Sequence, residues 1–195
     1  MHIGTHFFAG WLVAASPRDL TPRERGLIAV AGVAPDLDGL GIIGEYLTRN
    51  SSRPLTWYSD YHHVLGHNVG FALIVAGVTY ALSRRRRRLA SALAFVSVHL
   101  HLLLDVAGSR GSDGYQWPIP YLLPFSSALQ LTWDGQWWLG AWQNTAITTV
   151  LVFATVLIAW HRGYSPVALF SHKADAVFVG ALRRRFGEPR GATAK

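Results

Sequence analysis

The sequence predicts an all-α protein embedded in a membrane, built as a bundle of about five hydrophobic helices. Half of its 195 residues are hydrophobic and only 15% are charged, which is few for a soluble protein. The formal net charge is nevertheless +7, as expected for a membrane protein with basic cytosolic loops. The apolar residues gather into five segments, which are 7–15, 27–47, 69–82, 89–107 and 146–160.

The first two segments are irregular. Residues 7–15 are too few to cross a bilayer, since a crossing helix needs about 20 residues, and they lack the basic start of a signal peptide. Segment 27–47 is interrupted by Asp36 and Asp38, and Pro35 disfavours helix at the residue before it. We therefore expect a kink or a helix restart there, and we expect both helices to be short or to enter the membrane only part-way.

The three later segments are the candidates for complete spans. Segment 69–82 gains length from His67, segment 89–107 has membrane length, and segment 146–160 is uninterrupted. Between the last two lies a long region, 108–142, that is dense in tryptophan and tyrosine, which suits the lipid headgroup layer. This region could form a lid over a site, a shelf that faces lipid, or an interfacial belt with no catalytic role.

The distribution of arginine predicts the orientation. Most basic residues lie between the first two segments, between the third and fourth, and after the fifth, and an up-and-down path places all of these on one face. By the positive-inside rule this face is cytosolic, so membrane lipids are expected partners and nucleic acid is not. We expect residues 1–187 to form one domain and residues 188–195 to be a disordered tail.

Histidine and aspartate recur at the edges of the apolar segments. Ionisable groups in such surroundings are costly and are usually paired or bound to metal. The chain has no cysteine, so a metal must be held by histidine and carboxylate. The motifs are Thr5-His6, Pro35-Asp36-Leu37-Asp38, His62-His63, Gly66-His67-Asn68 and His99-Leu100-His101 followed by Asp105.

The spacing of these motifs favours one cluster. His63 and His67 are four residues apart, as are His101 and Asp105, so each pair would share a face if its segment is helical. The up-and-down path brings the motifs to the outer side of the membrane, about 14–25 Å from the basic loops at the rise of a helix. The predicted metal ligands are His6, Asp36, His63, His67, His101 and Asp105, with His62, His99 and Asn68 supporting them.

Simpler interpretations remain open for single residues. Asp36 or Asp38 could cap a helix, and His67 could be a hydrogen-bonded histidine at the membrane interface. A cluster that does bind metal suits hydrolysis by a metal-activated water, with Asp38 as the first choice of general base and Asp36 as the second. We expect one or two divalent ions, zinc first and manganese as the alternative.

The ordered motifs resemble a known family, the inner-membrane-associated metal-dependent hydrolases of the YdjM type, some of which are labelled LexA-binding. The resemblance covers about two-thirds of the chain, with departures at Val64 and Asn68, where members often have arginine and serine. It implies an inner-membrane location and metal-dependent hydrolysis. The matching elements are Thr5-His6 with Gly10, Pro35-Asp36-Leu37-Asp38, His63 to His67, His101 to Asp105 and Pro124-Phe125.

Three functions follow from these observations. The first is hydrolysis of an ester or phosphodiester in an amphiphilic, lipid-like substrate, because the cluster is expected in the outer half of the bilayer. All-helical zinc phospholipases C offer a loose analogy for this chemistry, and analogy does not fix function. The second is a membrane scaffold with a structural metal, and the third is an ion- or proton-coupled transporter.

Overall fold

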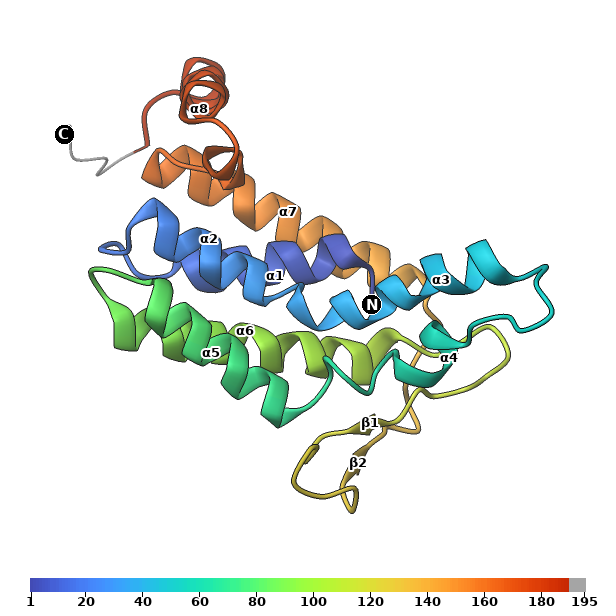
Figure 1. Ribbon diagram of the computed structural model, residues 1–195. Helices are drawn as coiled ribbons and strands as arrows, with labels where there is room; N and C mark the ends of the chain where they lie inside the picture. The colour runs from blue at the N-terminus through green and yellow to red at the C-terminus, as the bar shows by residue number, and fades with distance from the viewer. Residues whose placement is uncertain (190–195) are drawn as a thin grey trace.

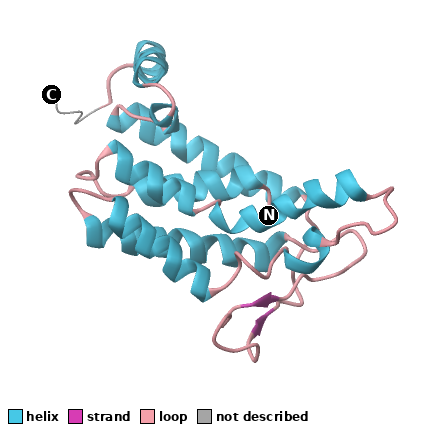
Figure 2. Cartoon of the chain, in the orientation of Figure 1, coloured by secondary structure: helices cyan, strands magenta, loops and turns pink. Residues whose placement is uncertain are grey.

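The computed structural model describes residues 1–189, and these are mostly helical, as predicted (Figures 1 and 2). The predicted tail 188–195 lies largely outside the described residues. The elements are α1 (Ile3–Ala15), α2 (Pro22–Ala31), the 3₁₀ helix η1 (Ala34–Leu40), α3 (Gly41–Thr48), α4 (Trp57–Tyr61), α5 (Val69–Leu82), α6 (Arg87–Gly108), β1 (Ile119–Pro120), β2 (Gln130–Leu131), α7 (Trp142–Arg162), the 3₁₀ helix η2 (Pro166–Leu169) and α8 (His172–Phe186).

The second apolar segment is broken as predicted. Helix α2 ends at Ala31, and the path that continues through η1 and α3 is bent from it by 52°. Pro35 lies in the first turn of η1, where its missing N–H group costs nothing. After the bend, Asp36 of η1 lies 3.6 Å from His101 of α6, and Asp38 of η1 bonds to the turn 62–68.

Helix α2 begins five residues earlier than its apolar residues suggest. The side chain of Thr21 accepts a hydrogen bond from the backbone of Glu24, and Glu24 accepts one from the backbone of Thr21. This reciprocal capping box satisfies N–H groups that a helix start otherwise leaves free. The buried Glu24 also accepts hydrogen bonds from the backbones of Arg85 and Arg86, so it ties the loop before α6 to α2.

Among the described residues, α6 and α7 are long and apolar enough to cross a membrane, and the bent path from α2 to α3 could be a third crossing. The prediction that the third apolar segment makes a complete crossing is wrong, because α5 has only 14 residues. It starts at Val69 because Asn68 caps it by accepting a hydrogen bond from the backbone of Phe71. His67 therefore lies outside this helix.

Small residues let the helices pack closely. Helix α1 contacts α2, α6 and α7, and α5 packs along α6. Where α1 and α2 cross, a Cβ atom on Gly10 would lie 2.9 Å from the carbonyl oxygen of Ala29, and one on Gly32 would lie 2.8 Å from that of His6. Alanines fill much of the remaining core. This close approach is typical of helices that associate in membranes.

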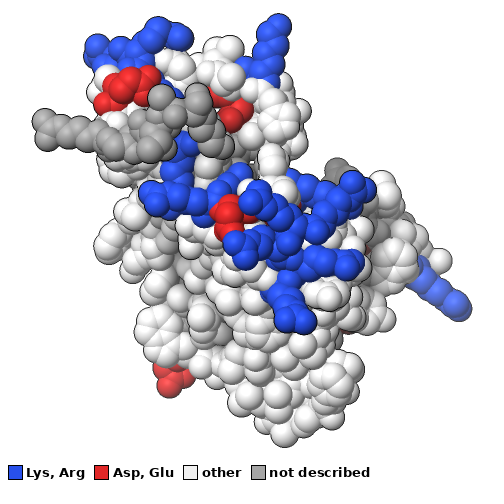
Figure 3. Space-filling view, turned by 90° about the vertical axis from the view of Figure 1, so that its left-hand side faces the viewer, with Lys and Arg blue, Asp and Glu red and all other residues white. Residues whose placement is uncertain are grey.

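The two ends of the molecule differ in charge. Figure 3 shows lysine and arginine gathered at one end, where the α1–α2 and α5–α6 loops meet the end of α7 and α8. The five arginines of 84–88 are all exposed. Helices α3 and α4 and the short β1–β2 hairpin lie at the opposite end (Figure 1).

We expect Gly10→Ala to lower the free energy of unfolding by about 1–3 kcal/mol, because the added methyl group meets backbone that cannot move aside. Thermal unfolding of the detergent-solubilised protein, followed by circular dichroism, measures this. Gly4→Ala is the matched control, since nothing lies within 4 Å of the added Cβ atom in the same helix. A Gly10→Ala variant as stable as Gly4→Ala would contradict the packing described.

Candidate metal centre

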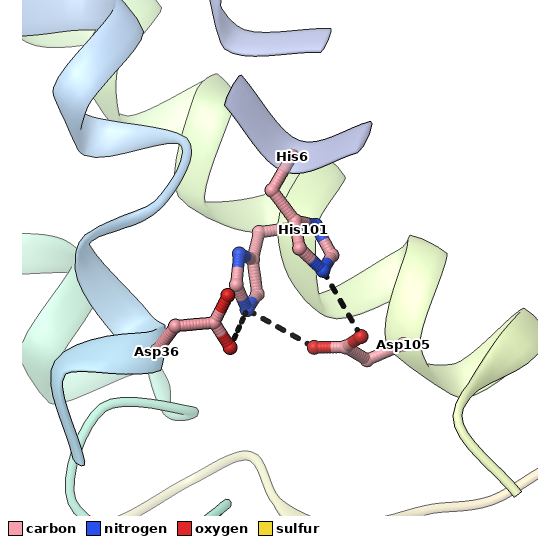
Figure 4. A group of neighbouring side chains, drawn as sticks. All are labelled: His6, Asp36, His101 and Asp105. Carbon is pink, nitrogen blue, oxygen red and sulfur yellow. Dashed lines mark ion pairs between the residues drawn. The ribbon is translucent and has the colours of Figure 1, made fainter. Parts of the chain in front are cut away.

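The structure brings together six residues that are distant in sequence. They come from α1, from η1, from the turn 62–68 and from α6, and four of them are shown in Figure 4. Five are buried, and Asp36 is partly exposed. The six are His6, Asp36, His63, His67, His101 and Asp105.

Helix α6 carries the centre of the cluster. His101 and Asp105 occupy successive turns of one face, and Nε2 of His101 lies 3.0 Å from Oδ2 of Asp105. Both side chains are buried. Oδ1 of Asp105 accepts a hydrogen bond from Ser109, and the amino group of Met1 contacts the same oxygen.

Helix α1 supplies His6. The hydroxyl groups of Thr5 and Thr148 lie 2.6 Å apart, and this contact fixes α1 against α7 beside the cluster. The His6 ring stacks on the His101 ring with 3.7 Å between centroids, and its Nε2 lies 3.2 Å from Oδ1 of Asp105. The Thr5-His6 motif thus combines an anchor to one helix with a ligand atom facing another.

The turn 62–68 supplies His63 and His67, but not as the helix face that their spacing predicts. That prediction is wrong because residues 62–68 form turns and bends, and His63 has a φ of 67°. Gly66 sits against Pro35 of η1, where a Cβ atom would lie 2.2 Å from the proline carbonyl oxygen. The side-chain amide of Asn68 donates to the carbonyls of Val64 and Leu65 and so closes the turn.

Asp38 organises this turn from the opposite side. Its Oδ2 accepts hydrogen bonds from the backbone of Gly66 at 2.9 Å and from Nδ1 of His67 at 3.0 Å, and its Oδ1 accepts one from Nδ1 of His62 at 2.8 Å. Both carboxylate oxygens of Asp38 therefore already accept hydrogen bonds. A carboxylate that accepts from one ring nitrogen fixes the tautomer and orientation of the imidazole.

The hydrogen bonds at Nδ1 leave Nε2 of the two central histidines available to bind a metal. Nδ1 of His67 donates to Asp38, and Nδ1 of His101 donates to the carbonyl of Gly32 at 2.8 Å. In each neutral ring Nε2 then carries a lone pair, and the two Nε2 atoms face each other at 3.1 Å. Two lone pairs at this distance repel, so either a proton on one ring or a bound cation must lie between the two nitrogens.

The turn histidines differ in pKa. Burial alone would lower the pKa of His67, but hydrogen bonds to Asp105 and Asp38 outweigh it and raise the pKa to about 9. Burial and the neighbouring His67 lower the pKa of His63 to about 3. Without another cation, His67 therefore holds a proton, which neutralises part of the carboxylate charge.

Asp36 forms the edge of the cluster. Its Oδ1 lies 3.6 Å from Nε2 of His101 and 4.0 Å from Nε2 of His67. The side chain is 21% exposed, whereas that of Asp105 is 2% exposed. Asp36 is therefore the member of the cluster that is most accessible from outside.

The donor set fits a divalent metal. Both ring nitrogens of His6 and Oδ2 of Asp105 are buried with no hydrogen-bond partner among the described residues. Such atoms are costly to bury, and a bound cation would satisfy Asp105 Oδ2 and one ring nitrogen of His6. Imidazole nitrogens with carboxylate oxygens suit zinc in the absence of thiolates.

Of the three residues predicted to support the metal ligands, two lie at the cluster and one does not. His62 touches the cluster through Asp38, and Asn68 shapes the turn, but His99 lies apart, bonded to the Phe95 carbonyl and the Tyr121 hydroxyl. In the tryptophan-rich region, the carbonyl of Trp117 lies 3.5 Å from Nδ1 of His63. Backbone groups such as this one and the Gly32 carbonyl carry no sequence signal, so the sequence analysis missed them.

The order of these motifs can be compared with known proteins. The profile of the YdjM inner membrane protein family matches residues 1–180, which include every member of the cluster. The chain belongs to the YdjM family. No curated protein and no solved structure matches it. As the name of the YdjM family implies, the protein belongs to the inner membrane, and α6 and α7 have the length and composition to span it.

We expect Asp38→Asn to weaken zinc binding by about 10–100-fold, because the amide cannot accept from His62, Gly66 and His67 together. Competition with a chelator of known affinity measures this. The exposed Asp134→Asn is the control for loss of one negative charge. Equal zinc affinities for the two variants would show that Asp38 does not orient a ligand.

Proposed function

We propose that this YdjM family member is an integral membrane, metal-dependent hydrolase acting on an ester or phosphodiester of an amphiphilic, lipid-like substrate. One observation carries the proposal. Lone pairs of histidine and aspartate converge inside an apolar helical protein, and Asp36 at the edge of the cluster is partly exposed. Buried ionisable groups of this kind in a membrane protein are functional candidates.

The six clustered residues would hold the metal, with zinc favoured and manganese as the alternative. A divalent ion bound there lowers the pKa of water toward neutrality and polarises a carbonyl or phosphoryl oxygen. The chain contributes the orientation of the ligands, which Asp38 and the Gly32 carbonyl fix through Nδ1 of His67 and His101.

The positions of the two η1 carboxylates suggest different roles. Asp38 is the base that the sequence favours, but both its oxygens already accept hydrogen bonds. We assign it to positioning. Asp36 is the partly exposed carboxylate at the cluster edge, so with one oxygen on the metal its other oxygen would accept the proton from the attacking water.

The surface around Asp36 supports a lipid-like substrate. Large apolar side chains on η1 and the turn 62–68 are exposed by more than half: Leu37 at 60%, Leu40 at 58% and Leu65 at 59%. The apolar exposure continues along α3 at Ile43 and Leu47. A substrate whose polar group reaches Asp36 can lay its hydrocarbon chains along these residues.

The proposed membrane placement follows from the charge distribution. The protein crosses the inner membrane several times, with the basic end of Figure 3 in the cytosol and the cluster toward the outer face. The unpaired apolar surface of η1 and α3 then meets lipid at the outer side.

We expect the purified protein, supplied with zinc or manganese, to hydrolyse a labelled phospholipid in vesicles of bacterial lipid. His67→Ala and Asp105→Ala should each lose at least about 100-fold in rate, more than residues that only support a ligand. The control is His172→Ala, at an exposed position of α8. Hydrolysis that survives both cluster variants would refute the proposal.

The same preparation distinguishes the two rival functions. Metal that raises the melting temperature without turnover of any lipid would indicate a scaffold with a structural metal. Cation or proton flux into liposomes without hydrolysis would indicate a transporter. Either result would overturn the hydrolase proposal.

The orientation can be tested directly because the chain has no cysteine. We expect Ser52→Cys, in the exposed loop after α3, to react in intact cells with a maleimide that cannot cross the inner membrane. Lys173→Cys, on α8, should react only after the membrane is opened. The reverse pattern would place the cluster on the cytosolic side.

A further inference from the structure

The clustered side chains divide into two groups that share one residue. His6, Asp36, His101 and Asp105 offer ligand atoms within 4.8 Å of one another, and so do His63, His67 and Asp105. We infer that the cluster holds two divalent cations, with the Asp105 carboxylate bridging them. The inference rests on the proposed metal site, and it concerns the number of ions and their shared ligand.

The number of donors exceeds what one ion uses. Zinc in proteins is almost always four-coordinate, whereas six side chains converge here. Bonds of about 2.0–2.2 Å put neighbouring ligand atoms of a tetrahedral site about 3.3–3.6 Å apart. The distances from His101 to Asp36 (3.6 Å), from His6 to Asp105 (3.2 Å) and from His67 to Asp105 (3.4 Å) are close to this spacing.

The two oxygens of Asp105 face different parts of the cluster. Oδ1 lies 3.2 Å from Nε2 of His6, and Oδ2 lies 3.4 Å from Nε2 of His67 and 3.0 Å from that of His101. Oδ2 is buried without a hydrogen-bond partner among the described residues, and so are both ring nitrogens of His6. A single cation near His67 and His101 would leave His6 unsatisfied.

Elemental analysis of the detergent-purified protein, loaded with zinc and freed of excess by gel filtration, tests the inference. We expect two ions in the wild type, one in His6→Gln, one in His63→Gln and none in Asp105→Asn. His99→Gln, at a half-buried histidine of α6 outside both groups, should keep two ions. Circular dichroism shows whether each variant is folded.

Loading the protein with manganese provides a second measurement, which detects two neighbouring ions in the wild type directly. Two adjacent Mn²⁺ ions should give a spin-coupled electron paramagnetic resonance signal in the wild type, and His6→Gln and His63→Gln should give the six-line signal of an isolated ion. One zinc ion per wild-type protein, together with the signal of an isolated manganese ion, would overturn the two-ion inference. The proposal of a hydrolase with a single metal ion would be unaffected. No bound metal at all would overturn both.

Discussion

The burial of Asp105 is the constraint on which the rest of the structure depends. A carboxylate at this depth in an apolar protein costs several kcal/mol unless positive charge and donors surround it. Here it is surrounded by His6, His67 and His101, each from a different part of the chain. Two of these histidines are held through Nδ1 by acceptors elsewhere, so their free nitrogens face the carboxylate. The helices therefore pack around a buried carboxylate whose negative charge a bound cation would balance.

The packing of the helices and the geometry of this centre depend on each other. Gly10 and Gly32 bring α1 and α2 into close contact, which places His6 beside α6 and lets the Gly32 carbonyl reach His101. Gly66 and Asp38 do the same for the turn 62–68 and η1. Larger residues at these glycines would separate elements whose spacing sets the ligand distances. Because most of the ligand atoms are buried, electrostatic interactions among them are stronger than they would be in water.

Much of this arrangement was readable from the sequence, and the reasons for the failures are physical. His101 and Asp105 are close because residues four apart on a helix lie on the same face. Pro35 indicated the break in the helix before η1. The capping box of Thr21 and Glu24 was also readable but lies before the apolar residues that defined the predicted helix. The turn at His63 was not predictable, since it depends on positive φ and on Asp38, more than 20 residues away in sequence. The role of Asp38 likewise follows from tertiary hydrogen bonds that no local pattern encodes.

The central claim is that these histidines and aspartates bind metal directly. Zinc K-edge X-ray absorption of the purified, zinc-loaded protein tests it most directly, because it reports the atoms bound to the metal. The account predicts a first shell of nitrogen and oxygen at about 2.0–2.2 Å, with the outer scattering of several imidazole rings, that is lost in the Asp105→Asn variant. Zinc bound only by water oxygens, or a wild-type spectrum unchanged in that variant, would contradict it.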